Sequence, residues 1–209
     1  DFTVGFQGTL GSVDVDFGAR NSESKSIVLG RNYVVAALAQ PLIADGTYNI
    51  YDPFAIDPTT AAGLITTINR ESTTKLQEVY GSANFDLCEM GGGTSSMVVG
   101  AEYRTEDWSD IYDSLSVAGV VSGSAGNSAF GDRDVTAVYF EALFPILDNF
   151  EANIAGRYDD YSDYGSDFAP RIALRYQPLD TLTLRGSWGQ GFRAPTLDIV
   201  GQQPAFGAD

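Results

Sequence analysis

The chain holds 28 acidic and 12 basic residues but no histidine, which limits the chemistry that it can perform. Without histidine there is no Ser–His–Asp triad, no Cys–His pair and no histidine-ligated metal. The only cysteine, Cys88, precedes the acidic Glu89 and has no neighbouring base, which argues against a nucleophilic role. Paired carboxylates could serve a glycosidase-like mechanism, but no pair stands out in so acidic a chain. We therefore expect no catalytic activity.

Two further patterns could hold a ligand, and each has a simpler explanation. Asp159, Asp160, Asp163 and Asp167 offer the carboxylate oxygens that calcium prefers, but their spacing is not that of an EF-hand loop and acidic surface loops are common. The segment 189–194 fits the G-x-G-x-x-A dinucleotide pattern, but a proline follows it at once and no βαβ unit surrounds it. We expect neither a bound metal nor a cofactor, and a lone cysteine forms no intrachain disulfide.

Many of the charged residues occupy alternate positions of short, otherwise apolar segments. In Glu151–Tyr158 the odd positions hold Glu, Asn, Ala and Arg, whereas the even positions hold Ala, Ile, Gly and Tyr. This period of two predicts β-strands with one apolar face and one charged face. About eight strands are expected, at roughly ten residues for each membrane crossing. They are Phe2–Thr9, Ser12–Arg20, Lys75–Leu87, Met97–Arg104, Val135–Phe144, Glu151–Tyr158, Arg171–Tyr176 and Leu182–Trp188.

The connections between these strands are of two kinds. Asp148-Asn149, Pro178–Asp180 and Glu89–Gly93 form short turns, whereas 21–70 and 109–131 form long polar loops, the first with a short helix near Tyr33–Ala39. Short turns at one end and long loops at the other are typical of a bacterial outer-membrane barrel. Aromatic residues near the expected strand ends favour the same architecture, since their rings prefer the membrane–water interface. They are Trp108, Tyr112, Tyr161, Tyr164, Trp188 and Phe192.

Composition agrees with such a β-chain. Hydrophobic residues make up 44% of the sequence, and there is no run of about 18 apolar residues that would form a transmembrane helix. A net charge of −16 argues against nucleic acid or anionic lipid as a partner, because both would be repelled. No signal peptide precedes Asp1, and the chain ends at Asp209 in a Gly/Pro/Gln segment, so we expect a piece of a larger protein.

Several short motifs occur between about Glu78 and Leu197, with one more before them. The sharpest is Gly191-Phe192-Arg193-Ala194-Pro195; the others are Tyr48–Phe54, Gly100–Arg104, Gly131–Val135, Gly156–Gly165, Ala169–Arg171 and Leu184–Trp188. Together they strongly resemble the barrel of the TonB-dependent outer-membrane receptors.

The resemblance implies an all-β, antiparallel transmembrane barrel of 22 strands with a plugged lumen, of which residues 1–209 supply a middle section of the wall. It implies energised uptake of a scarce nutrient (siderophore-bound iron, a corrinoid, haem or a saccharide) through the outer membrane of a Gram-negative bacterium. A TonB-type energy-coupling protein would pull on the plug, and outer-membrane lipid would surround the barrel. Nothing in this chain resembles the plug domain, the TonB box or the aromatic C-terminal strand, so we expect the plug and both barrel ends to lie outside it.

The charged residues that such a barrel would turn inward toward the lumen and plug are Glu102, Arg104, Glu141, Arg157, Arg171 and Arg185. We expect them to pair across neighbouring strands or to hold the plug. Contacts with the nutrient would instead lie on the long loops 21–70 and 110–130.

For the Gly191–Pro195 motif we expect a structural role rather than ligand contact. Gly191 would permit a close backbone approach or an unusual dihedral angle, and Pro195 would end strand pairing because it has no N–H. Arg193 could face carboxylates of a plug or a neighbouring strand, or lie at the rim.

Two other architectures compete with the receptor barrel. One is a small, complete eight-stranded barrel with a structural or adhesive role. The other is a soluble β-sandwich binding module with outward charges, which would pack Phe140, Ile154, Leu174 and Leu184 against a second sheet.

Overall fold

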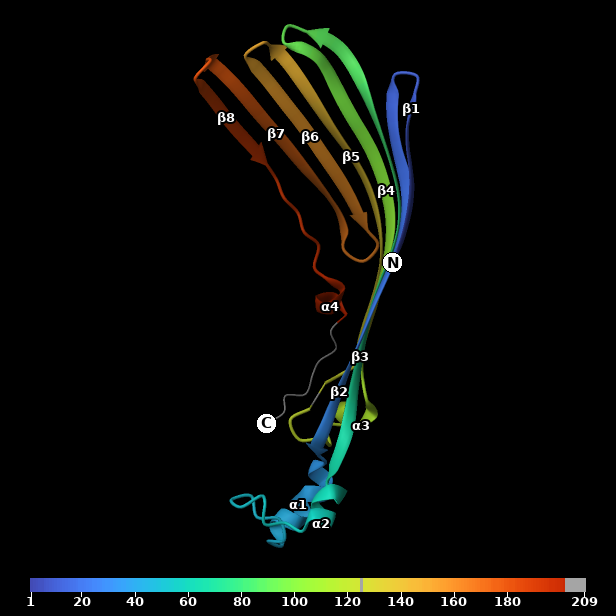
Figure 1. The fold of residues 1–209 in the computed structure, drawn as a ribbon, viewed down its shortest axis with the longest axis vertical. Coiled ribbons are helices and arrows are strands. Elements are labelled where there is room, and N and C mark those ends of the chain that lie inside the picture. Colours follow the sequence, from blue (N-terminus) through green and yellow to red (C-terminus); the bar gives the residue numbers. More distant parts are fainter. Residues whose placement is uncertain (125, 202–209) are drawn as a thin grey trace. The chain divides into compact units, whose positions relative to one another are not determined.

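A computed structural model describes residues 1–124 and 126–201, and it is dominated by one antiparallel β-sheet (Figure 1). The strands pair in sequence order, so each lies beside its neighbours in the chain. They are β1 (Phe2–Leu10), β2 (Val13–Val34), β3 (Ile65–Met90), β4 (Gly93–Tyr112), β5 (Ala129–Leu147), β6 (Phe150–Tyr161), β7 (Gly165–Leu179) and β8 (Leu182–Gly189). The prediction of an all-β wall with about eight antiparallel strands is confirmed.

The chain divides into two compact units. The first comprises Asp1–Glu23, Lys75–Glu106 and Asp132–Pro195. The second comprises Ser24–Thr74, Asp107–Gly131 and the segment that starts at Thr196. The helices belong to the second unit: α1 (Ala36–Ala44), α2 (Pro58–Gly63), α3 (Ser114–Val117) and α4 (Leu197–Val200). Within the described ranges no helix is long and apolar enough to cross a membrane.

In the first unit, the strand register gathers the apolar residues on one face. In the β1–β2 hairpin, Phe6 lies opposite Phe17, with ring centroids 5.3 Å apart. The same alternation continues across β5–β8, where two rows of the apolar face are Ala142–Ile154–Ile172–Trp188 and Phe144–Ala152–Leu174–Gly186. The opposite face, which we call the charged face, includes the rows Glu141–Ala155–Arg171–Gly189 and Pro145–Glu151–Arg175–Arg185.

The apolar face is left uncovered by the described part of the chain. Ile154, Leu174 and Leu184 are 40%, 43% and 52% exposed, although burying such a side chain stabilises a protein by about 1.5–3 kcal/mol. A β-sandwich would have packed these residues against a second sheet, but the eight described strands form a single sheet. The exposed band therefore favours apolar surroundings outside this chain over the sandwich.

The second unit has a small core of its own. Ala39, Leu64, Val121 and Ala129 are buried there. Backbone hydrogen bonds join the β2–β3 connection to the β4–β5 connection, from Ala36 N to Val120 O at 2.8 Å, for example. These connections are therefore folded and not merely solvated.

The predicted loops are wrong in extent. Residues 21–34 and 65–70 continue β2 and β3, and β4 runs to Tyr112 instead of ending near Arg104. Trp108 and Tyr112 consequently lie within a strand rather than after one. The short helix expected at Tyr33–Ala39 begins at Ala36 and extends through Pro41. Residue 125, in the expected loop 109–131, and residues 202–209, expected to end no strand, lie outside the described ranges.

Candidate functional site

Arginine and carboxylate side chains on β4 and β6 form a continuous ladder on the charged face. Glu102, Arg104 and Glu106 are two residues apart on β4 and so share a face. Arg104 donates from Nη1 to Glu102 Oε1 at 3.1 Å and from Nε to Glu106 Oε1 at 2.8 Å. Arg157 on β6 donates to Glu102 as well, and its Nη2 donates to Asp159 Oδ1 at 2.8 Å. Glu102 therefore accepts hydrogen bonds from two arginines.

The strand between them, β5, leaves room for this contact. Ala137 lies opposite Asp159 and is fully buried, and its methyl group lets longer side chains from β4 and β6 meet above it. Tyr139 lies opposite Arg157, whose guanidinium carbon is 5.8 Å from the ring centroid. The ring in turn covers Gly100, where a Cβ atom would clash with it. The missing side chain of Gly100 thus leaves space for the Tyr139 ring beside the ladder.

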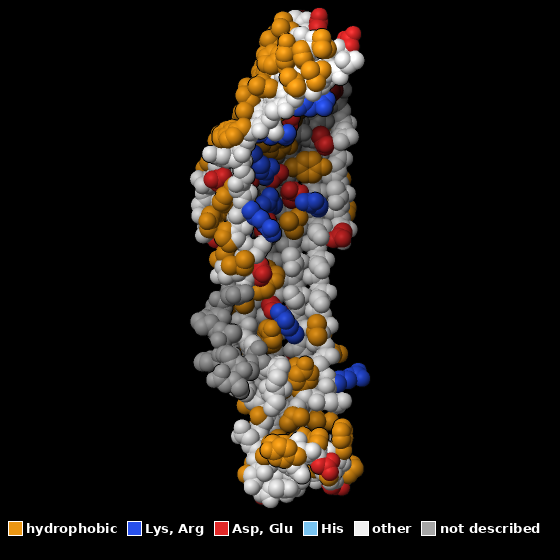
Figure 2. Space-filling view, turned by 90° about the vertical axis from the view of Figure 1, so that its left-hand side faces the viewer, with side chains coloured by type: hydrophobic (Ala, Val, Ile, Leu, Met, Phe, Trp, Pro, Cys, Tyr) orange, Lys and Arg blue, Asp and Glu red, His pale blue; other side chains and the backbone are white. Residues whose placement is uncertain are grey.

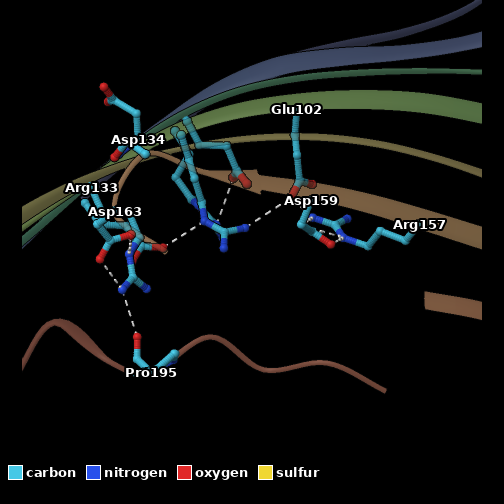
Figure 3. A network of polar contacts seen from close by, with 12 residues as sticks. Glu102, Arg133, Asp134, Arg157, Asp159, Asp163 and Pro195 are labelled. Carbon is cyan, nitrogen blue, oxygen red and sulfur yellow. Dashed lines mark hydrogen bonds and ion pairs between the residues drawn. The ribbon is translucent and has the colours of Figure 1, made fainter. Parts of the chain in front are cut away.

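A second set of contacts, which we call the arginine clamp, joins β5 to the segment after β8 (Figure 3). Arg133 is only 4% exposed and donates to both oxygens of Asp163, from Nε at 2.8 Å and from Nη2 at 2.7 Å. Its Nη2 also donates to the carbonyl oxygen of Pro195 at 2.8 Å. Bidentate, charge-assisted bonds of this kind are among the strongest in proteins. The clamp therefore fixes the end of the Gly191–Pro195 motif to the sheet.

Aromatic packing fixes the same motif at its other end. The Phe192 ring lies 5.8 Å from Tyr161 and 5.8 Å from Tyr164, measured between centroids. Arg193 is exposed. The φ of Gly191 is not positive, which contradicts the unusual dihedral angle expected there. Among the described residues no heavy atom lies within 4 Å of the position of a Cβ atom at Gly191, and a close backbone approach by any other segment stays a prediction. Pairing of β8 with β7 ends near Gln190, so Pro195 is not what ends this pairing.

The structure separates the six charged residues predicted for the inner face. Glu102, Arg104 and Arg157 meet in the ladder. Glu141 accepts a hydrogen bond from Asn153 Nδ2 at 2.8 Å. Arg171 and Arg185 join neither group and form no ion pair within residues 1–124 and 126–201. That these residues face a lumen or a plug stays a prediction.

Arg133 and Asp163 were not predicted as partners, although both lie within the matched motifs Gly131–Val135 and Gly156–Gly165. They are 30 residues apart in sequence, and Arg133 is 62 residues from Pro195. Periodicity places a residue on a strand face, but it does not predict such distant contacts.

Two of the four aspartates weighed as calcium ligands contact arginines instead. Asp159 and Asp163 accept hydrogen bonds from Arg157 and Arg133, which supply the positive charge a cation would bring. In the described part of the chain no group of three or more His, Cys, Asp or Glu residues could hold a metal ion.

In the second unit, a polar cluster ties the ends of β3 and β4 to helix α3. Arg70 Nε donates to Asp110 Oδ1 at 2.7 Å, and its guanidinium carbon lies 4.7 Å from the centroid of Tyr112. Asp113 caps α3 by accepting from the backbone N–H of Leu115 at 2.9 Å. Partial burial would raise the pKa of Asp113, but the hydrogen bonds to its carboxylate outweigh burial and hold the pKa below its ordinary value.

Comparison with known proteins places this arrangement in a family. A family model described as "TonB dependent receptor-like, beta-barrel" matches residues 2–208. The vitamin B12 transporter BtuB of Photobacterium profundum is 31% identical over 114 residues, which are 47% of this chain and 18% of the transporter.

Among solved structures, a chain of the FpvAI–pyocin S2 complex superposes with a TM-score of 0.55 at 12% identity, over 90% of this chain and 25% of that one. The siderophore receptor PirA of Pseudomonas aeruginosa superposes with a TM-score of 0.46 at 16% identity, over 93% of this chain and 34% of PirA. The chain thus spans no more than about a third of the relatives it matches. Since the family model covers almost every residue, the chain belongs to the β-barrel family of the TonB-dependent receptors.

Proposed function

We propose that this chain supplies a section of the barrel wall of an outer-membrane receptor that imports a scarce nutrient in a Gram-negative bacterium. The barrel would be larger than the sheet described here, with 22 strands as the sequence resemblance implies. The family consists of receptors and transporters, and we propose no catalytic role.

The observation that carries this proposal is the two-faced sheet of the first unit. One face exposes Phe6, Ile154 and Leu184, and the other holds the ladder and the clamp. Figure 2 shows Lys and Arg side chains gathered with Asp and Glu on one face of the molecule. A barrel wall needs this division, because lipid surrounds the outside while the interior is polar.

In this proposal, outer-membrane lipid contacts the apolar face, and the charged face lines the interior, where a plug would lie. The short turns β1–β2, β3–β4, β5–β6 and β7–β8 would face the periplasm, as short turns do in outer-membrane barrels. The long connections β2–β3 and β4–β5 would then face the cell exterior, as long loops do in such barrels. A TonB-type energy-coupling protein would act through the plug.

For the ligand, a corrinoid is favoured over siderophore-bound iron, haem or a saccharide. The transporter BtuB of Photobacterium profundum, which is similar to this chain over 114 residues, is a vitamin B12 transporter. Residues of the second unit, in 35–64 and 113–128, are the proposed ligand contacts.

Uptake assays in the source bacterium test this function. Cells with and without the gene should be compared for uptake of cobalt-labelled cobalamin and of a panel of iron-labelled siderophores. We expect one ligand to accumulate only in cells that hold both this receptor and the TonB-type protein. Detection of the protein in the cytoplasm, or uptake that is independent of the TonB-type protein, would contradict the proposal.

A further inference from the structure

We propose that a groove on the apolar face of β2, β3 and β4 binds one lipid of the outer leaflet, with the acyl chain against apolar side chains and the carbonyl linkage of that chain against amide and hydroxyl groups. The inference rests on the proposed function for placing this face in the membrane. It goes beyond general contact with lipid, because it assigns one site with a polar rim that distinguishes lipids by their linkage.

The groove lies in the first unit and has a volume of about 370 Å³. Ala19 on β2, Val79 on β3 and Tyr103 on β4 are among the residues that line it. Each of these three strands pairs with a neighbour on both sides, so the sheet beneath the groove is continuous. The methyl group of Ala19 is the smallest side chain in the lining and keeps the floor low. The volume is within the range of about 300–1,000 Å³ that is typical of small-molecule pockets.

Strand alternation places the lining on the apolar face. Tyr103 lies between two residues of the ladder on β4, so its side chain points to the face opposite the ladder. Arg20 and Glu78, which also border the groove, pair with each other at 2.8 Å on the charged face. Their neighbours Ala19 and Val79 therefore point to the apolar face. The side chains that the groove presents are thus uncharged, as are an acyl chain and its carbonyl linkage.

Polarity rises along the groove in the same direction on all three strands. Two residues farther toward the long connections, or about 7 Å along the strand, each apolar residue is followed by a neutral polar one. These polar residues are Asn21, Gln77 and Thr105. A membrane lipid has the same order, with the carbonyl groups directly above the hydrocarbon chain. Amide N–H and hydroxyl groups donate hydrogen bonds to such oxygens. The groove therefore matches the chain and its linkage together.

Tyr103 is held at the boundary between the apolar and the polar part of the groove. Its hydroxyl group donates a hydrogen bond to the carboxylate of Asp134 on β5. An aromatic ring with one polar end is typical of the membrane–water interface. Because this hydrogen bond orders the ring before a lipid arrives, binding costs less conformational entropy.

The test is photo-crosslinking of the whole receptor in nanodiscs of phosphatidylcholine. The probe is a phosphatidylethanolamine with a photoreactive diazirine near the carbonyl end of one acyl chain, and mass spectrometry locates the crosslinks. We expect crosslinks at Val79 and Tyr103 to exceed those at Ile154 and Ile172, elsewhere on the apolar face, by at least about threefold. A probe with ether linkages in place of the esters should lose this excess, because it has no carbonyl oxygen to accept the hydrogen bonds.

Two variants separate the shape of the groove from its polar rim. Ala19→Trp should fill the floor and lower crosslinking at Val79 by at least about fivefold, with crosslinking at Ile154 unchanged. Gln77→Leu keeps the floor open and serves if Ala19→Trp does not assemble; it should make the ester and ether probes crosslink equally. Asn84→Leu, which removes an amide from the charged face of β3, is the matched control and should leave the preference for the ester intact.

The site is overturned if crosslinking at Val79 and Tyr103 only equals that at Ile154, or if it depends neither on the ester linkage nor on position 19. The same experiment separates this inference from the proposed function. Crosslinks at Ile154 and Ile172 without an excess in the groove refute the lipid site alone. Absence of crosslinks at all four positions refutes the lipid-facing wall as well.

Discussion

Replacing Arg133 by methionine should destabilise the protein by about 3 kcal/mol. The change keeps much of the apolar stem but removes the two bonds to Asp163 and the bond to the Pro195 carbonyl. Loss of one partner from a buried ion pair costs about 3–5 kcal/mol, because the remaining charge is left without compensation. The Asp163 side chain is 19% exposed and keeps some water, which places the expected cost at the lower end.

Urea unfolding of the purified receptor, followed by tryptophan fluorescence, measures this cost. Arg20→Met is the matched control, because Arg20 is 48% exposed and its pair with Glu78 should contribute less than about 1 kcal/mol. A double-mutant cycle with Asp163→Asn should give a coupling energy of at least about 2 kcal/mol. The clamp would be refuted if Arg133→Met and Arg20→Met lowered the free energy of unfolding equally, or if the coupling energy between Arg133 and Asp163 were near zero.

Three further predictions concern other parts of the chain. Gly100→Val should lower the free energy of unfolding in urea by about 1–3 kcal/mol, because the valine side chain meets the Tyr139 ring. Adding Tyr139→Ala should recover part of this loss. Additive losses in the double variant would contradict the contact between position 100 and the Tyr139 ring. Ile154→Arg should lower the yield of folded receptor in outer membranes, because an arginine that faces lipid destabilises a barrel by about 2–4 kcal/mol. Asn153→Arg, on the opposite face of the same strand, should be tolerated. Equal yields of the two variants would contradict the assignment of faces. The lowered pKa of Asp113 contributes stability that is present above its ordinary value of 3.8 and is lost as the pH falls through the lower, folded-state value. The backbone amides that Asp113 caps should therefore lose hydrogen-exchange protection in that acid range. Protection that stays constant across this range would refute the cap.

The sequence was sufficient to predict the wall but not the length of its strands. Alternation in Glu151–Tyr158 identified both faces of β6 correctly, because a strand repeats every two residues. The same rule failed beyond Arg104, where Glu106–Tyr112 contains mostly polar residues on both faces. Polar residues at a strand end resemble a loop, and only pairing with neighbouring strands distinguishes the two.

The sequence was sufficient to predict which face of the sheet the site residues occupy, but not which residues contact one another. Glu102 and Arg157 were both assigned to the charged face, but their contact spans an intervening strand and depends on the small residue Ala137. The role of the Gly191–Pro195 motif was expected to be structural, yet the contacts that hold it come from Arg133 and Tyr161, on two earlier strands. Such contacts follow from register, which sequence patterns leave open.

The orientation of the sheet in the membrane is the most direct test of the proposed barrel wall. Single cysteines at each position of Ala152–Arg157, in a Cys88→Ser background, would carry spin labels in the whole receptor in outer-membrane vesicles. Collisions with lipid-soluble oxygen and with a water-soluble nickel complex are then compared position by position. We expect labels at even positions to meet oxygen and labels at odd positions to be shielded from it. Uniform exposure to the nickel complex, or the opposite alternation, would contradict a lipid-facing apolar surface.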